Sequence, residues 1–105
     1  MGIKEGDEVI IPDSTFAATI NAVLYCNATP VICEINNETW CIDENEIKSL
    51  ITSKTKAIIP VYMGGRYVDF SKIKKIAKRY KLKIIEDAAQ GLFGKNYNKF
   101  IIFKL

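Results

Sequence analysis

The chain has 105 residues, of which 49% are hydrophobic and 26% are charged, a mixture typical of a soluble globular domain rather than a disordered chain. This length provides for one small domain with a single core and excludes a two-domain enzyme with a substrate cleft between its parts. The net charge of +3 comes from lysines spread along the chain, so the charge favours neither a nucleic acid nor a membrane as partner.

The cysteines and the apolar runs both indicate a cytoplasmic protein. No apolar run approaches the ~20 residues that span a bilayer, and no charged leader followed by an apolar stretch opens the chain. Cys26, Cys33 and Cys41 have no paired spacing, and the chain has no histidine. The sequence therefore predicts neither a disulfide framework nor a zinc site, but three buried or half-buried thiols.

The first predicted elements are a strand, a short polar loop and a helix. The run "DEVIIP" at 7–12 is short, β-branched and ends in a proline, which favours a buried strand. The segment 13–27 begins with Ser14 or Thr15 as a cap and then carries apolar residues at i, i+4, i+7 and i+8, the spacing of one helix face. These apolar residues are Phe16, Ile20, Val23 and Leu24.

A second strand and a well-marked helix start come next. The run "TPVICEI" at 29–35 is rich in β-branched residues and predicts a strand. Asp43 is the predicted N-cap of a helix over 44–51, and Glu46, three residues on, completes an acidic version of the capping box. This helix should present Ile47 and its neighbours to a core.

Two further strands flank a basic helix. The run "KAIIPVYM" at 56–63 is apolar almost throughout, which favours burial on both faces. A helix starting from Asp69 or Ser71 and ending at residue 80 places apolar residues on one stripe and basic residues opposite. The run "LKIIEDAA" at 82–89 predicts a fourth strand that ends in two acids. The apolar stripe of the helix consists of Ile73, Ile76, Ala77 and Tyr80.

This order of elements predicts an α/β fold. Strands that alternate with helices at this period form parallel βαβ units, which place helices on both faces of a mainly parallel sheet. In such a sheet, ligands bind beyond the carboxyl ends of the strands. The loops at those ends cover 12–16, 34–37, 63–66 and 86–90.

The most suggestive of these loops is the last, in which a carboxylate emerges from an apolar strand. An acid that is half removed from water usually meets a cation or a hydrogen-bond donor. Composition leaves a second interpretation open, in which Glu86 and Asp87 cap the next segment or face solvent. Phe16 suits core packing as well as a platform for a flat cofactor, and Ser14 and Thr15 suit helix caps as well as phosphate ligands.

Three segments, taken together, resemble a known family. They are "GDEVIIPDSTFAATINAVLYCNATPVICEI" at 6–35, "TKAIIPVYMGG" at 55–65 and "LKIIEDAAQ" at 82–90. Their order and spacing resemble the DegT/DnrJ/EryC1/StrS sugar aminotransferases, fold-type-I enzymes that use pyridoxal 5'-phosphate, over about residues 3–99. The resemblance implies a partial three-layer α/β/α fold, with residues 1–105 forming the central part of the large domain and no small C-terminal domain.

The resemblance also implies roles for three residues. Asp87 matches the acid whose carboxylate pairs with the protonated pyridine nitrogen of the cofactor, which keeps the ring an electron sink. Phe16 matches the aromatic residue that lies against the ring, and Gln90 matches the position that supports the polar edge of the ring. Thr15 belongs to the same segment as Phe16 but acquires no distinct role. The resemblance implies no metal ligand.

Two features of the family pattern are not matched. The family's phosphate-binding turn lies upstream of the segment equivalent to "GIKEGDEV", and its Schiff-base lysine follows a later strand. Lys95, Lys99 and Lys104 are present, but none stands in the matching context. The sequence therefore predicts no catalytic residue in this chain and no transamination by the chain alone, as for a truncated gene product or one part of a split gene.

The expected activity of the intact enzyme is amino transfer to a keto nucleotide sugar for polysaccharide or cell-surface glycan synthesis. A donor such as glutamate and a homodimer are expected with it. One alternative is a non-catalytic remnant or interaction module that binds no cofactor. A weaker one is an unrelated doubly wound domain that binds a nucleotide sugar, although no glycine-rich phosphate loop supports it. A sheet without its neighbours should also be poorly soluble.

Overall fold

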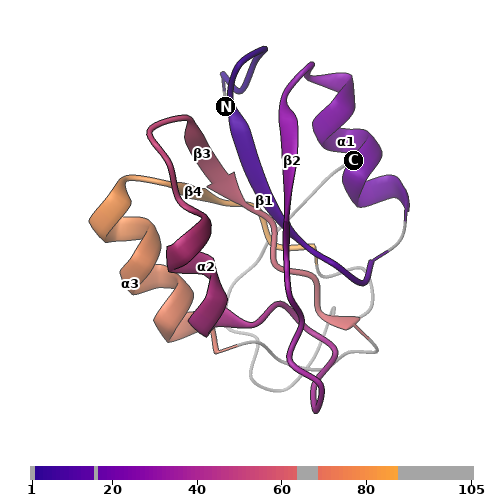
Figure 1. The fold of residues 1–105 in the computed structure, drawn as a ribbon, viewed down its shortest axis with the longest axis vertical. Coiled ribbons are helices and arrows are strands. Elements are labelled where there is room, and N and C mark those ends of the chain that lie inside the picture. Colours follow the sequence, from indigo (N-terminus) through magenta and orange to yellow (C-terminus); the bar gives the residue numbers. More distant parts are fainter. Residues whose placement is uncertain (1, 16, 64–68, 88–105) are drawn as a thin grey trace.

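The computed structural model describes residues 2–15, 17–63 and 69–87, which form a four-stranded sheet and three helices (Figure 1). All strand pairs are parallel, and the strand order is β2-β1-β3-β4. The strands and helices are β1 Glu8–Pro12, α1 Ala17–Tyr25, β2 Thr29–Cys33, α2 Glu44–Leu50, β3 Thr55–Ile58, α3 Phe70–Tyr80 and β4 Lys83–Ile84.

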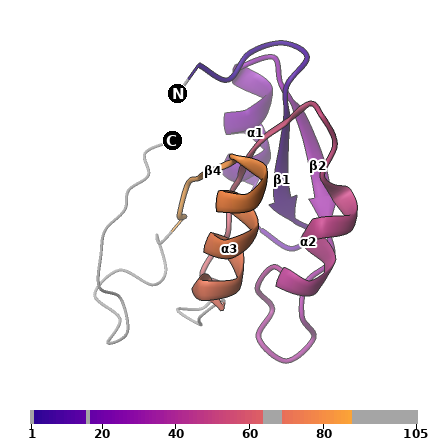
Figure 2. The same cartoon turned by 90° about the vertical axis from the view of Figure 1, so that its left-hand side faces the viewer.

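Helices cover both faces of the sheet. Helix α1 lies on one face, and α2 and α3 lie side by side on the other (Figures 1 and 2). Alternate residues of β1 supply both layers, because successive strand side chains point to opposite faces. Ile10 packs with Ile47 and Ile73 on the α2 and α3 side, whereas Val9 and Ile11 pack with Val23 of α1. The predicted α/β class with a parallel sheet is confirmed.

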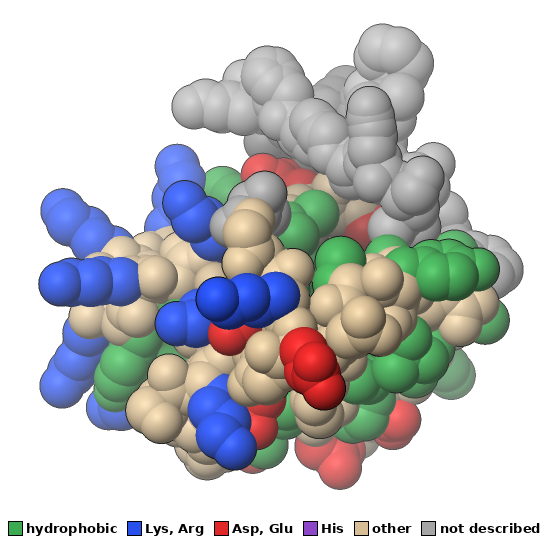
Figure 3. Space-filling view, turned by 90° about the horizontal axis from the view of Figure 1, so that it is seen from above, with side chains coloured by type: hydrophobic (Ala, Val, Ile, Leu, Met, Phe, Trp, Pro, Cys, Tyr) green, Lys and Arg blue, Asp and Glu red, His purple; other side chains and the backbone are tan. Residues whose placement is uncertain are grey.

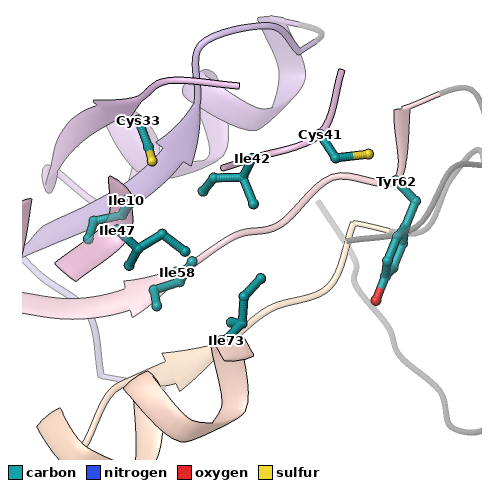
Figure 4. Close-up of a cluster of buried hydrophobic side chains, with 8 residues drawn as sticks. All are labelled: Ile10, Cys33, Cys41, Ile42, Ile47, Ile58, Tyr62 and Ile73. Atoms are coloured by element: carbon teal, nitrogen blue, oxygen red, sulfur yellow. The ribbon is translucent and has the colours of Figure 1, made fainter. Parts of the chain in front are cut away.

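The larger core cluster lies between the sheet and the helices α2 and α3. Figure 4 shows isoleucines from the strands β1 and β3 and from the helices α2 and α3 pointing toward one another, with Tyr62 at one side. The cluster consists of Ile10, Cys33, Cys41, Ile42, Ile47, Ile58, Tyr62 and Ile73. The near-continuous apolar character of β1 fits its burial on both faces, in this cluster and in the cluster on the α1 side.

The predicted stripe of α1 is partly wrong. Val23 is buried and Ile20 packs against the α1-side cluster, but Leu24 is 51% exposed. The buried line of the helix instead contains Thr19, which is 1% exposed and stands one turn before Val23. Thr19 and Val23 are four residues apart and therefore lie on the same side of the helix, whereas Leu24 is rotated about 100° from Val23 around the helix axis.

The predicted strand 56–63 is interrupted, and so is the described part, 82–87, of the predicted strand 82–89, whose last two residues lie outside the described ranges. The ladder between β3 and β4 ends at Ile58, because Pro60 has no N–H to continue it. A separate parallel bridge between Val61 and Asp87 then extends the pairing to the strand ends.

Both helices on the second face begin at a predicted aspartate. Asp43 Oδ1 accepts a hydrogen bond of 3.0 Å from the Asn45 N–H. Its own N–H donates to the Glu34 carbonyl at 2.9 Å. In a capping box the side chain of Glu46 would accept from this N–H, so here a backbone carbonyl takes the place of that carboxylate. Asp69 caps α3.

Helix α3 keeps its basic residues in solvent, as predicted. Lys and Arg side chains gather on the α3 side in Figure 3, and Ile73 and Ala77 face the core. The exposed basic residues of the helix are Lys72, Lys74, Lys75, Lys78 and Arg79. No helix in the described ranges is long and apolar enough to cross a membrane.

The cysteines differ in burial. Cys33 and Cys41 are buried in the larger cluster, but Cys26 is exposed after the end of α1, so the prediction of three buried or half-buried thiols is wrong for it. Burial, and next the charge of Asp43, raise the pKa of Cys33 to about 12. Its thiol is therefore protonated and unreactive at neutral pH.

Candidate functional site

The carboxyl ends of the parallel strands meet at one edge of the sheet, where the sequence predicts the site. Residues 12–15 follow β1, residues 61–63 follow the β3 segment, and Glu86 and Asp87 follow β4. Parallel strands direct all these ends to the same edge, so residues from distant parts of the chain converge there.

The backbone of Asp87 is held by its neighbouring strand. Its N–H donates to the Pro60 carbonyl at 2.9 Å, and its carbonyl accepts from the Tyr62 N–H at 3.1 Å. These two bonds form the parallel bridge to Val61. Asp87 is half-buried, and its main chain cannot turn without breaking the pairing.

The side chain of Asp87 meets helix α1. Thr19 Oγ1 donates to Asp87 Oδ2 at 3.2 Å, across 68 residues of sequence. Thr15 Oγ1 lies 2.9 Å from Thr19 Oγ1, so the two hydroxyls and the carboxylate form a connected row. The interpretation of Asp87 as an acid that simply faces solvent is therefore wrong.

Glu86 has a different environment from its neighbour. Tyr62 Oη donates to Glu86 Oε2 at 2.6 Å, and Tyr62 belongs to the core cluster on the α2 and α3 side. Consecutive residues of a strand point to opposite faces, and here one carboxylate meets each face. The two acids therefore have different hydrogen-bond partners, which their position in the sequence does not distinguish.

Of the three predicted cofactor residues, Asp87 is the one that the structure describes. Phe16 and Gln90 lie outside the described residues. Thr19 was not predicted as a site residue, although it is the last residue of the family motif "PxxTFxAT" at 12–19. That position in the motif was the available sign, because nothing else in the sequence distinguishes this threonine from others in a helix.

Two hollows lie at the opposite, amino edge of the sheet. The larger has a volume of about 480 Å³ beside Thr52 and Tyr80, and the smaller has about 300 Å³. The smaller hollow is lined by Lys4, Lys56, Lys81 and Lys83, together with Gly2, Ile3 and Asp7. Exposed lysines around an open hollow are typical of a solvated surface, so we place the candidate site at the carboxyl edge with Asp87.

Known proteins similar to this chain include several that are named as aminotransferases. A Bacillus subtilis 3-oxo-glucose-6-phosphate:glutamate aminotransferase is 49% identical over 92 residues, covering 88% of this chain and 21% of the relative. Caulobacter vibrioides GDP-perosamine synthase is 45% identical over 92 residues, 88% of this chain and 25% of the relative. A Pseudomonas aeruginosa UDP-2-acetamido-2-deoxy-3-oxo-D-glucuronate aminotransferase is 43% identical, with 92% of this chain and 27% of the relative covered.

Solved structures show the same fold. NtdA from Bacillus subtilis, crystallised with its bound cofactor PMP, matches with a TM-score of 0.84 and 49% identity, over 87% of this chain and 21% of that one. A DegT/DnrJ/EryC1/StrS aminotransferase from Brucella abortus matches with a TM-score of 0.84 and 35% identity, over 87% and 26%. The chain thus spans about a fifth to a quarter of the length of these relatives. Residues 1–101 match the family model, and the chain belongs to the DegT/DnrJ/EryC1/StrS aminotransferase family.

Proposed function

We propose that this chain supplies the ring-nitrogen side of a pyridoxal-phosphate site that transfers an amino group to a keto nucleotide sugar. The observation that carries the proposal is Asp87, a half-buried carboxylate held at the carboxyl edge by the β3 backbone and by Thr19. Family membership supports the cofactor. The names of the Caulobacter and Pseudomonas relatives support a nucleotide sugar as substrate.

The residues present fit the nitrogen side of such a ring. When bound, the cofactor supplies a protonated ring that accepts an electron pair as the amino group moves. Asp87 offers the acceptor that holds the proton on the ring nitrogen. A carboxylate has two oxygens and about four acceptor positions, so a bond from Thr19 is compatible with a second bond from the ring N–H.

Phe16 and Gln90 complete this side of the proposed site. We place Phe16 against the face of the ring, where an aromatic side chain excludes water and stacks on a flat cofactor. We place Gln90 at the polar edge of the ring on the Asp87 side. Both placements rest on the family motif, "PxxTFxAT" for Phe16 and "IEDAAQ" for Gln90.

We also propose that these 105 residues are the central part of the large domain and do not complete the transfer alone. The Bacillus relative, of which the chain covers 21%, is about four times as long. Lys95, Lys99 and Lys104 do not match the family's lysine motif, so the lysine that binds the cofactor should come from elsewhere. A homodimer and glutamate as donor are proposed with it, the latter from the name of the Bacillus relative.

A transplant into a complete relative tests the function. The 97 residues of the Pseudomonas enzyme that align with this chain would be replaced by this sequence. The chimera should bind pyridoxal phosphate and aminate UDP-2-acetamido-2-deoxy-3-oxo-D-glucuronate. Asp87→Ala should lower the transfer rate by about 100- to 1,000-fold, the usual effect of removing one preorganised electrostatic partner.

The 105-residue chain alone provides the second test. It should form no adduct that borohydride reduction fixes on a lysine, as read by mass spectrometry. A reduced adduct on Lys95, Lys99 or Lys104 would contradict the proposal that the lysine comes from elsewhere. A folded chimera that binds no cofactor would favour the alternative of an interaction module.

A further inference from the structure

We infer that Thr19 is a positioning residue whose hydroxyl fixes the orientation of the Asp87 carboxylate, and that Thr15 in turn orients the hydroxyl of Thr19. The target of that orientation, the ring nitrogen of the cofactor, rests on the proposed function. The hydrogen bonds that join Thr15, Thr19 and Asp87 do not depend on the proposed function, because they are observed in the described chain.

The burial of Thr19 is the first observation. Its side chain is 1% exposed, on the line of α1 that faces the sheet, where the next residue one turn on is the apolar Val23. An unpaired hydroxyl in such a place costs free energy, and an apolar residue would avoid that cost. The bonds to Asp87 and Thr15 satisfy the hydroxyl of Thr19 and account for a polar residue on this line.

The direction of the hydrogen bonds follows from the number of protons. An ionised aspartate accepts hydrogen bonds and donates none, and a threonine hydroxyl has one proton to donate. Thr19 therefore donates to Asp87 Oδ2, and the bond between the two threonines must be donated by Thr15. Each bond polarises the next, so Thr15 strengthens the donor that reaches the carboxylate.

The backbones of both partners in the hydrogen bond between Thr19 and Asp87 are held by their neighbours. Helix α1 is docked on the sheet by Val23, which packs with Val9 and Ile11, and the β-branched side chain of Thr19 has few rotamers. The backbone of Asp87 is paired with Pro60 and Tyr62. The Thr19 bond acts on the rotation of the Asp87 carboxylate, which the backbone pairing does not fix.

This rotation matters for a carboxylate that must meet one ring N–H. A displacement of about 1 Å at a reacting group can cost roughly 100-fold in rate. A hydroxyl on a second element is a way to hold the acceptor in place before the cofactor binds.

Two matched variants separate positioning from simple packing. Thr19→Val keeps the size and the β-branch but removes the hydroxyl, and Thr19→Ser keeps the hydroxyl but removes the methyl. If Thr19 only packs α1 on the sheet, valine is the better replacement. If Thr19 positions Asp87, serine is the better replacement, because it keeps the hydroxyl.

The first measurement uses the full 105-residue chain without cofactor. Scalar couplings in the NMR spectrum should show one χ1 rotamer for Asp87 in the wild type and in Thr19→Ser, and rotamer averaging in Thr19→Val. Thr29→Val, which changes an exposed threonine of β2, is the control and should leave Asp87 unchanged. A single unchanged rotamer in Thr19→Val would overturn the inference.

Thr15→Val keeps the test decisive if Thr19→Val does not fold. It leaves Thr19 as donor but removes its orienting partner, so Asp87 should average between rotamers to a smaller extent. An Asp87 rotamer that is unchanged in Thr15→Val, together with averaging in Thr19→Ser, would equally overturn the inference.

The second measurement adds pyridoxal phosphate to the chimera. Thr19→Val should weaken cofactor binding by about tenfold, the loss expected from one hydrogen bond to a charged group, and Thr19→Ser should restore it. Failure of the parent chimera to bind would reject the proposed function, while the Asp87 rotamers would still decide the role of Thr19. Equal cofactor affinity in a binding chimera with and without the Thr19 hydroxyl would overturn the inference alone.

Discussion

Glu86 and Asp87 are neighbours in sequence, but their carboxylates meet opposite layers of the molecule. Glu86 accepts a hydrogen bond from Tyr62 in the core cluster on the α2 and α3 side, and Asp87 accepts one from Thr19 of α1. The pleat of the strand causes this separation. Glu86 is thus bonded to the core cluster on one face, and Asp87, for which we propose the cofactor contact, is bonded to α1 on the other.

Exchanging each acid for its amide should therefore have different effects. We expect Glu86→Gln to lower the free energy of unfolding by about 1–3 kcal/mol, because Tyr62 loses a charged acceptor, with cofactor affinity in the chimera little changed. Asp87→Asn should mainly weaken cofactor binding. Urea denaturation and pyridoxal phosphate titration measure the two effects, and equal losses of cofactor affinity in both variants would contradict the division.

The core cluster should dominate stability. Ile47 of α2 is fully buried in the larger core cluster, and Ile47→Ala should lower the free energy of unfolding by about 2–5 kcal/mol through lost burial and a residual cavity. Leu24→Ala is the matched control. Leu24 is 51% exposed, so its change should stay within about 0.5 kcal/mol. Similar destabilisation by both variants in chemical denaturation would show that α1 buries Leu24 after all.

The start of α3 should depend on acid pH. The Ser71 hydroxyl, followed by the Lys72 N–H, lowers the pKa of Asp69 below its ordinary value of 3.8. A lowered folded-state pKa stabilises the helix above the unfolded pKa, and this contribution is lost as pH falls below 3.8 through the folded value. Amide NMR signals of the first turn of α3 should weaken over that range.

Ser71→Ala is the informative variant for this effect. It removes the hydroxyl that donates to Asp69 Oδ1 at 2.7 Å, so the pKa of Asp69 measured by NMR should rise toward 3.8. Asp69→Asn should abolish the acid dependence of the first turn. An unchanged pKa of Asp69 in Ser71→Ala would show that another donor sets it.

The three thiols should react at different rates. Cys26 is exposed and should be alkylated first in the folded chain. Cys33 is buried with a pKa of about 12, so its thiolate fraction at pH 8 is about 1,000-fold below that of an ordinary thiol. Mass spectrometry after iodoacetamide treatment should show one modified cysteine under native conditions and three in urea. Rapid native alkylation of Cys33 would contradict its burial.

Self-association should depend on β2. This outer strand of the described sheet exposes 46% of Ile32, and Leu24 and Tyr25 of α1 are exposed as well. An exposed apolar edge strand can pair with the edge strand of another chain, and a lysine on the edge opposes this pairing. We expect Ile32→Lys to reduce the sedimentation coefficient of the 105-residue chain at high concentration, whereas Thr29→Lys, on the same strand, should reduce it less.

The amino-acid sequence by itself determined the local elements of this protein. Apolar periodicity predicted β1, β2 and α3 nearly as they are, because the side chains that form a strand or a helix face are close together in the chain. Asp43 and Asp69 marked two helix starts for the same reason, since a cap bonds to residues two or three positions on. The family motifs pointed to Asp87, which the structure places at the carboxyl edge of the sheet.

Only the tertiary structure decided which distant residues meet. The strand order β2-β1-β3-β4 is not contained in the alternation of strands and helices, and Pro60 shortened a strand that looked continuous. Thr19 is part of the family motif at 12–19, but only the fold shows that its hydroxyl meets Asp87, 68 residues away. The buried face of α1 was misjudged at Leu24 for the same physical reason, because burial depends on the partner surface as well as on spacing.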